Sequence, residues 1–274
     1  MTDRCILYDV AERIGTITLN RPEQHNAVNY ELAESLREAM LRADADESVR
    51  VIVLTGAGKS FCVGADISAI RAAAGAAPPQ ARSLASLKWP LDSAIRHDFQ
   101  GTHTYFPTIG KPIICMINGA AAGLGLVYAA FCDIRFSADD SVFAAAFVRR
   151  GLAAEWGSAW ILPKLMGHAH ATEFLLSGRK IKAPEARELG LINRSIPRED
   201  LREATYAYAR DIATNCAPVA LRLQKRQIWE SHFQTLGESN MMFKEFTQIV
   251  LATEDVREAT SSFIEKRTPN FKGR

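Results

Sequence analysis

Short apolar segments alternate with turns over the first two thirds of the chain. Ile6, Tyr8 and Val10 recur at every second position, which is typical of a strand with one buried face. After a turn that contains glycine, Ile17 and Leu19 repeat this spacing. Two such segments joined by a short turn predict a β-hairpin at the start of the chain.

A helix and several buried strands are predicted next. Asn29, a residue type favoured at helix N-caps, precedes apolar residues at helical spacing. These residues are Leu32, Leu36, Ala39, Met40 and Ala43. The runs 51–54 and 113–117 are short and apolar, as expected of buried strands, and 133–136 is a third candidate. Strands that alternate with helices indicate an α/β fold.

The chain changes character after about Pro197. No strand pattern follows, and helical patterns cover 198–214, 219–233, 236–252 and 256–266. We therefore expect a mixed body over residues 1–197 and a helical region over 198–274 that packs against its own body or a neighbouring subunit. Between residues 75 and 86, Ala, Gly, Pro and Ser dominate, which predicts a loop or an irregular helical insertion.

Composition narrows the possible partners. With 274 residues, 47% hydrophobic and 23% charged, the chain resembles soluble globular proteins with a large core. Its 33 basic and 31 acidic residues leave a formal net charge of +2, which argues against nucleic acid as the main partner. No apolar run approaches the roughly 18 residues of a membrane-spanning helix.

The N-terminus and the cysteines both favour a cytoplasmic protein. The first residues lack the charged-then-apolar pattern of a secretory signal. The cysteines are scattered, odd in number and without a C-x-x-C pair, so we expect reduced, mostly buried thiols. They are Cys5, Cys62, Cys115, Cys132 and Cys216.

Three short motifs suggest chemistry that the rest of the sequence does not support. Residues 58–60 read Gly-Lys-Ser, but a phosphate-binding loop needs glycine where Val53 stands. Residues 177–180 match S-x-x-K without its companion motifs. His168 and His170 have no further ligand at useful spacing, so no metal site is expected. A nucleophile elbow, G-x-S-x-G, is absent from the sequence.

Two glycine-rich turns carry the candidate chemistry. Residues 60–67 and 117–126 each follow a predicted buried strand, and the second turn runs into an apolar helical segment. Small residues let backbone N–H groups approach a ligand closely, and a helix that begins near Gly123 adds the positive end of its dipole. Two amides directed at one point form an oxyanion hole, in which one donor contributes about 3–4 kcal/mol.

With their context, these turns resemble the crotonase superfamily (enoyl-CoA hydratase/isomerase), and the resemblance extends over nearly the whole chain. The motifs are Leu19-Asn20-Arg21-Pro22 with Asn26-Ala27, Val51-Ile52-Val53-Leu54-Thr55-Gly56, Phe61 with Gly64-Ala65-Asp66-Ile67, Lys111-Pro112-Ile113-Ile114 with Asn118-Gly119, Cys132-Asp133-Ile134-Arg135, Ala183 with Glu185-Ala186 and Gly190-Leu191, and Phe263-Ile264-Glu265-Lys266-Arg267 with Pro269 and Phe271. The resemblance implies an α/β crotonase (ClpP-like) fold, which is a spiral of β-β-α turns with a helical C-terminal trimerisation region. It also implies a homotrimer or homohexamer and an acyl-CoA thioester as ligand. Coenzyme A would be part of the substrate, and no separate cofactor is expected.

The same resemblance assigns roles to residues. The amides of Ala65 and Leu124 are expected to hold the thioester carbonyl while its α-carbon takes on enolate character. Further residues are expected to contact the substrate or its CoA portion. They are Gln24, His25, Ala27, Gly64, Asp66, Ile67, Gly123, Phe263 and Lys266. The last two match positions that sometimes reach CoA from a neighbouring subunit, although Lys266 is also consistent with an ordinary solvated charge. Asp66 and Asp133 are better explained as structural or helix-capping residues than as catalytic ones.

The candidate acid or base is Glu155. The hydratase branch uses two glutamates, and the matching positions here hold Val127 and Phe147, neither of which can transfer a proton. Glu155 matches the position where isomerase-type members carry Asp or Glu and where a dehalogenase branch carries a nucleophilic Asp. The alternative is that Glu155 caps the following helix.

One carboxylate is enough to move a proton between the α- and γ-carbons, so the sequence favours an enoyl-CoA isomerase. An enoyl-CoA hydratase that acts on 2-enoyl-CoA is the first alternative. A non-catalytic acyl-CoA-binding protein is the second; Val127 and Phe147 favour it and Glu155 argues against it.

Overall fold

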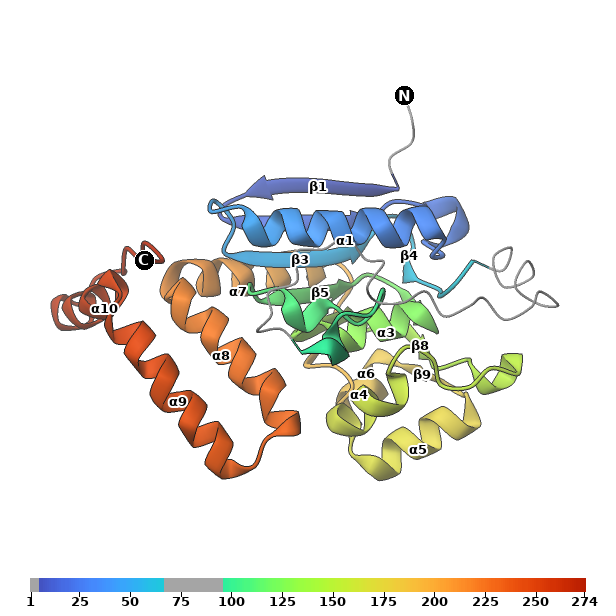
Figure 1. Cartoon of the computed structure of the whole chain (residues 1–274). Helices are drawn as coiled ribbons and strands as arrows, with labels where there is room; N and C mark the ends of the chain where they lie inside the picture. The colour runs from blue at the N-terminus through green and yellow to red at the C-terminus, as the bar shows by residue number, and fades with distance from the viewer. Residues whose placement is uncertain (1–4, 67–95) are drawn as a thin grey trace.

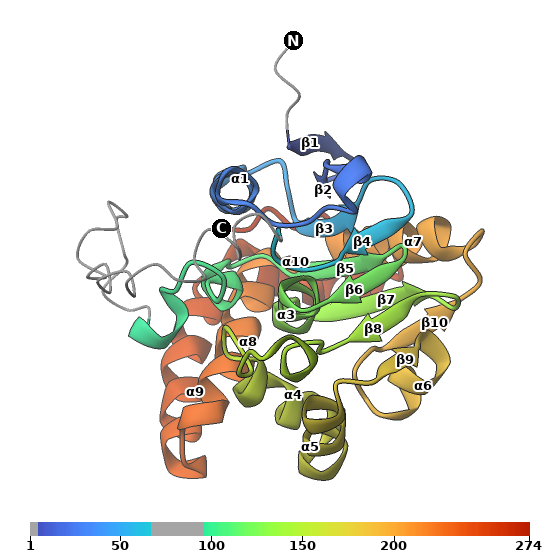
Figure 2. The same ribbon diagram turned by 90° about the vertical axis from the view of Figure 1, so that its right-hand side faces the viewer.

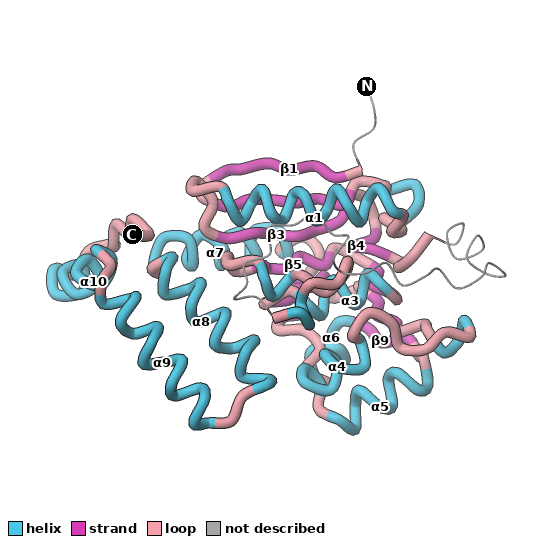
Figure 3. Tube along the Cα trace, viewed as in Figure 1, coloured by secondary structure: helices cyan, strands magenta, loops and turns pink. Residues whose placement is uncertain are grey.

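The computed structural model of the protein describes residues 5–66 and 96–274. Strands in these ranges form two sheets (Figures 1 and 3). The larger sheet has the order β1-β2-β3-β5-β7-β10, and the smaller has the order β4-β6-β8-β9. The strands are β1 (Ile6–Ala11), β2 (Ile14–Leu19), β3 (Val51–Gly56), β4 (Ser60–Cys62), β5 (Ile113–Ile117), β6 (Ala120–Ala122), β7 (Ile134–Ala138), β8 (Val142–Ala144), β9 (Lys180–Lys182) and β10 (Arg194–Ile196).

Helices cover the sheets and form the C-terminal part of the chain. The α-helices are α1 (Tyr30–Ala45), α3 (Leu124–Phe131), α4 (Ser158–Met166), α5 (His168–Ser177), α6 (Ala183–Glu188), α7 (Leu201–Asn215), α8 (Pro218–Glu230), α9 (Leu236–Leu251) and α10 (Glu254–Glu265). Short 3₁₀ helices are η1 (Pro22–Gln24), η3 (His97–Phe99), η4 (Phe106–Thr108), η5 (Val148–Arg150) and η6 (Ser231–Phe233).

The N-terminal hairpin and the first helix form where their local patterns predict them. β1 and β2 pair antiparallel with Ile6 opposite Leu19, and β2 continues the sheet by parallel pairing with β3. Asn29 caps α1, because its side-chain oxygen accepts a hydrogen bond from the Leu32 amide at 2.9 Å. Such a cap contributes about 1 kcal/mol to helix stability. Both predictions are confirmed.

The central strands are apolar at every position because helices cover both faces of the larger sheet. Successive side chains of a strand point to opposite faces. In β3, Ile52 and Leu54 join the core that includes α1, whereas Val51 and Val53 join a second core that includes Ala209 of α7. Full burial of each such side chain stabilises the fold by roughly 1.5–3 kcal/mol. The strands predicted at 51–54 and 113–117 are therefore confirmed, and 133–136 overlaps β7.

Successive pairs of strands build a spiral. β3, β5 and β7 add to the larger sheet by parallel pairing, and the strands that follow them, β4, β6 and β8, add to the smaller sheet, also in parallel. In Figure 2, each of these short strands lies beside the long strand that precedes it. Since β4 and β6 run parallel as neighbours, their carboxyl ends meet at one edge. The glycines of both turns, Gly64 and Gly123, follow the strands at that edge.

Downstream of β10, all the described elements are helices, as predicted. α7 packs on the larger sheet. The Asp133 carboxylate fastens α8 to the body of the molecule, because it lies 2.7 Å from Lys225 Nζ and accepts a hydrogen bond from Trp229 Nε1 at 3.1 Å. α9 and α10 extend away from the sheets (Figure 1). The chain then returns, and the Arg50 guanidinium donates a hydrogen bond to the Phe271 carbonyl at 3.2 Å.

The remaining global predictions have mixed outcomes. All five cysteines are free thiols and four are buried, as expected. Among the residues that the structure describes, no helix is long and apolar enough to cross a membrane. The predicted loop at 75–86 and the candidate site residue Ile67 lie outside the described residues.

Candidate active site

The first glycine-rich turn leaves the end of β4 and places Ala65 next to a second strip of backbone. Gly64 has a φ of 106°, a conformation that favours glycine. Its carbonyl accepts a hydrogen bond from the Val28 amide at 2.8 Å, and the Asp66 amide donates to the Val28 carbonyl at 2.9 Å. These two hydrogen bonds fix the residues on both sides of Ala65, and the Ala65 amide itself takes no part in the pairing with Val28.

The second turn leads directly into α3. Gly123, with φ 50° and ψ −121°, is the N-cap of this helix, and every residue of α3 is buried. Leu124 is the first helical residue, so its amide has no partner within the helix. Gly125 allows α3 to lie directly on β4, because a Cβ at that position would stand 2.1 Å from the Cys62 carbonyl oxygen.

The two turns are in van der Waals contact. A Cβ added to Gly64 would lie 3.4 Å from the Leu124 nitrogen, and one added to Gly123 would lie 3.7 Å from the Gly64 Cα. Within the ranges 5–66 and 96–274, neither the Ala65 amide nor the Leu124 amide donates a hydrogen bond to the backbone. The structure therefore brings together two turns that each hold an unused donor beside glycine.

The predicted CoA strip lies against the first turn. Gln24 and His25 are exposed, whereas Ala27 is buried. The His25 carbonyl accepts a hydrogen bond from the Val63 amide at 3.3 Å, which connects the strip to the turn directly. The Asp66 carboxylate lies 3.1 Å from the Arg21 guanidinium, which agrees with the structural role expected for this aspartate.

Glu155 lies in the segment between η5 and α4. Its side chain is half-buried and makes no hydrogen bond or ion pair with the described residues. The N-cap of α4 is Gly157, without a side-chain cap, and the Glu155 carbonyl, not its carboxylate, accepts the Ser158 amide at 3.0 Å. The predicted alternative of a capping glutamate is therefore wrong.

An aromatic contact that the sequence analysis missed connects the Glu155 segment to α3. Trp156 has a φ of 51°, is 45% exposed and meets the ring of His103 edge to face at a centroid distance of 4.4 Å. The buried His103 is joined through Nδ1 to the Tyr128 hydroxyl of α3 at 2.8 Å. Burial lowers the pKa of His103 to about 4, so its ring is neutral near pH 7. No local pattern marks this histidine, because its partners come from other segments.

A cavity lies apart from these turns. A space of about 620 Å³ at the C-terminal end of α3 separates α8 from the body of the molecule and is lined in part by Ala130, Ile161 and Ile228. None of its lining residues belongs to either glycine-rich turn. The two turns meet at the other, N-terminal end of α3, and this contact is the candidate active site.

Residues 9–274 match the family described as enoyl-CoA hydratase/isomerase. The chain belongs to this family. It is 32% identical over 270 residues to the 1,2-epoxyphenylacetyl-CoA isomerase of Escherichia coli K12, with 98% of each chain covered.

Solved structures agree with the assignment. An enoyl-CoA hydratase from Bacillus anthracis superposes with a TM-score of 0.86 at 31% identity, covering 98% of this chain and 100% of that one. The enoyl-CoA hydratase EchA1 from Mycobacterium marinum gives a TM-score of 0.85 at 31% identity, covering 99% and 100%. The predicted α/β crotonase fold is confirmed, and the protein is a crotonase-type enzyme of the hydratase/isomerase family, which an acyl-CoA substrate fits.

Both positions that matched the paired hydratase glutamates are packed with apolar side chains. Val127, on α3, has no exposed surface, and Phe147 is 4% exposed. Proton transfer at either position is therefore impossible in this family member.

The C-terminal candidates lie far from the two turns within one chain. Phe263 is 85% exposed on α10, and Lys266 is the left-handed C-cap of that helix. Figure 1 places α10 at one end of the molecule and β4 towards the other. Their predicted contact with CoA thus needs a second copy of the chain, and it stays a prediction.

Other sequence candidates have structural roles or none. Asp133 accepts a hydrogen bond from the Ile113 amide at 2.7 Å in addition to its contacts with α8. The Gly-Lys-Ser motif forms the end of the turn between β3 and β4 together with the first residue of β4. His168 and His170 are exposed on α5, and the described residues contain no group of His, Cys, Asp and Glu that could hold a metal.

Proposed function

We propose that the protein isomerises the double bond of an enoyl-CoA. The observation that carries this proposal is the state of Glu155: a half-buried carboxylate without a polar partner in the described residues, on a segment tied to α3, while Val127 and Phe147 are apolar. A free carboxylate at this place can act first as a base and then as an acid.

The reaction follows from these groups. The Glu155 carboxylate removes a proton from the α-carbon of a 3-enoyl-CoA, and the electron pair delocalises into a dienolate. The Ala65 and Leu124 amides donate hydrogen bonds to the thioester oxygen, which carries the developing negative charge; one such donor accounts for about 10²–10³ in rate. The carboxylic acid of Glu155 then returns the proton to the γ-carbon, which yields the 2-enoyl-CoA. Coenzyme A is part of the substrate, and no other cofactor enters.

A hydratase is the second candidate, because the similar solved structures carry that name. Hydration of a 2-enoyl-CoA would leave Glu155 as the only acidic member of the sequence-matched positions. We rank the hydratase second because the two glutamates that add water in the hydratase branch are replaced in this chain by Val127 and Phe147.

Purified protein incubated with a 3-enoyl-CoA and, separately, with a 2-enoyl-CoA distinguishes these candidates. Isomerisation that falls by at least about 10²-fold in Glu155→Gln supports the proposal. The matched control is Glu188→Gln, which makes the same chemical change at an exposed position of α6. Hydration that survives Glu155→Gln would refute the assignment of Glu155, and binding of CoA esters without turnover of either substrate would favour the acyl-CoA-binding alternative.

We also propose a homotrimer or homohexamer in the cytoplasm, assembled through the C-terminal helices. Large apolar side chains stand exposed on α8, α9 and α10, an arrangement typical of an association surface. They are Ile228, Leu236, Met241, Phe243, Ile249, Leu251, Phe263 and Ile264. Sedimentation velocity measures the assembly: a trimer or hexamer is expected, and a stable monomer at micromolar concentration would contradict the proposal.

A further inference from the structure

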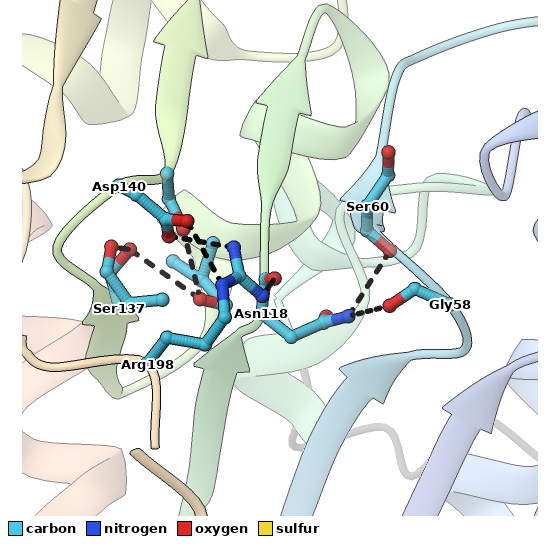
Figure 4. A network of polar contacts seen from close by, with 9 residues as sticks. Gly58, Ser60, Asn118, Ser137, Asp140 and Arg198 are labelled. Carbon is cyan, nitrogen blue, oxygen red and sulfur yellow. Dashed lines mark hydrogen bonds and ion pairs between the residues drawn. The ribbon is translucent and has the colours of Figure 1, made fainter. Parts of the chain in front are cut away.

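Two side-chain amides hold the turn that precedes the first glycine-rich loop. The Asn26 Nδ2 donates to the carbonyls of Ala57 and Ser60 at 2.9 and 2.8 Å. The Asn118 Nδ2 donates to Gly58 and Ser60 at 3.0 and 3.5 Å. Figure 4 shows the Asn118 side chain reaching across from its own turn to this one.

The side-chain oxygen of Asn118 also accepts a hydrogen bond. This Oδ1 receives a hydrogen bond from the Gly56 amide at 3.2 Å. The Thr55 hydroxyl lies 3.4 Å from the same oxygen and donates at the shorter distance of 2.9 Å to the Met116 carbonyl. One side chain thus satisfies donors and acceptors at both ends of the turn between β3 and β4. Asn118 directly follows β5. Its side chain therefore connects the turn that precedes β4 and the Ala65 amide to the turn that precedes β6 and the Leu124 amide.

The strands between these turns and the proposed oxyanion hole are too short to fix the geometry alone. β4 and β6 have three residues each, and their register shifts between Ser60 and Cys62. The backbones nevertheless touch, since a Cβ on Gly119 would lie 2.0 Å from the Lys59 carbonyl oxygen. A slip at the turns would therefore be carried along β4 and β6 to the amides of Ala65 and Leu124.

We propose that Asn118 is a positioning residue that sets the separation of the two oxyanion-hole amides. This inference rests on the proposed function in needing an enolate at the site, but it does not depend on which acid or base forms it. The CoA strip is held separately, because the Asn26 Oδ1 accepts the Arg21 amide at 2.9 Å. Loss of Asn118 should therefore disturb the stabilisation of the enolate more than the binding of CoA.

The test uses Asn118→Asp, which keeps the acceptor and removes both donors, and Asn118→Ala, which removes the whole contact. The matched control is Arg198→Ala. Arg198 is exposed and donates to the main-chain carbonyl of Asn118 at 2.7 Å and to Asp140, so its loss loosens the same turn without touching the side-chain clamp (Figure 4). Thermal unfolding confirms which variants are folded, and either Asn118 variant decides the question if the other fails to fold.

Two measurements follow on the full-length protein. Isomerisation kinetics should show kcat lowered about 10- to 100-fold in both Asn118 variants, with KM changed less than about threefold, because a displacement of about 1 Å costs up to about 10² in rate. Titration with acetoacetyl-CoA, whose enolate absorbs in the near ultraviolet, should show the enolate band with the unaltered protein and its loss in the Asn118 variants. Arg198→Ala should keep both properties.

The outcomes separate this inference from the proposed function. If the unaltered protein shows the enolate band but does not isomerise the substrate, the isomerase proposal is refuted. The presence or absence of the band in the Asn118 variants still decides the positioning role in that case. Folded Asn118 variants that keep kcat and the band overturn that role. The positioning role is likewise overturned if Arg198→Ala lowers kcat and the enolate band as much as Asn118→Asp does, or if the unaltered protein shows no enolate band.

Discussion

Gly125, the second residue of α3, offers a direct test of how closely the helix must lie on β4. In Gly125→Ala the new methyl group would start 2.1 Å from the Cys62 carbonyl oxygen and 2.7 Å from the Cys62 Cβ. Ordinary contact begins near 3.4 Å, so α3 has to move by about 1 Å. Neither neighbour is the end of a flexible side chain, and therefore the backbone itself must shift.

Two opposing terms set the expected size of the effect. Overpacking costs about 1–3 kcal/mol, whereas alanine in place of glycine returns up to about 1 kcal/mol of helix propensity. We expect a net loss of about 1–2 kcal/mol in the free energy of unfolding. The same displacement carries the Leu124 amide, which precedes Gly125 directly, away from its position, so kcat should fall by about 10².

Gly237→Ala supplies the control. Gly237 is also the second residue of its helix, α9, but it is exposed, and the new Cβ would meet only the Thr235 hydroxyl at 3.9 Å. That variant should be as stable as the unaltered protein or slightly more stable, with unchanged kcat. Urea unfolding and isomerisation kinetics measure both quantities. If Gly125→Ala matched Gly237→Ala in stability and rate, close contact of α3 with β4 would not control the site.

Three further predictions concern buried ionisable groups. Asp133→Ala leaves Lys225, 7% exposed, without its carboxylate and should lower the free energy of unfolding by about 3 kcal/mol in urea titrations; adding Lys225→Met should recover part of it. Burial lowers the pKa of His103 from 6.5 to about 4, so the unfolded chain takes up a proton first as the pH falls through that range. Stability should thus drop by about 3 kcal/mol between pH 6.5 and pH 4, and a His103→Phe variant with the same drop would rule out this histidine as its source. Burial raises the pKa of Cys62 to about 12, so iodoacetamide at pH 8 should label this thiol only after unfolding, as peptide mass spectrometry can show; labelling in the native state would contradict its burial.

Elements with a local pattern were predictable from the sequence, and those made by distant partners were not. The hairpin, the helix capped by Asn29 and the buried strand at 51–54 each show their period within one segment. The smaller sheet does not, because strands of three residues are too short to show alternation. β6 consists of three alanines, a residue that favours helices, and it is a strand only because it pairs with β4 and β8.

The candidate site divides in the same way. The glycine-rich turns stand out by composition, whereas the contact of Gly64 with Gly123 is visible only in the structure. The connection from Trp156 through His103 to Tyr128 could not be predicted, since it depends on side chains brought together by tertiary packing. Its histidine and tyrosine are 25 residues apart in the sequence.

The C-terminal helices have a mechanical consequence that follows from where they are attached. The excursion formed by α9 and α10 leaves the body just after Trp229, which is bound to Asp133, and rejoins it where Phe271 meets Arg50. Between these two anchors, α9 also packs against α8, where the Arg226 guanidinium lies over the buried Phe246 ring. Removing the last few residues would therefore release α10 and leave α9 held against α8, whereas an insertion between the two helices would leave each anchor intact.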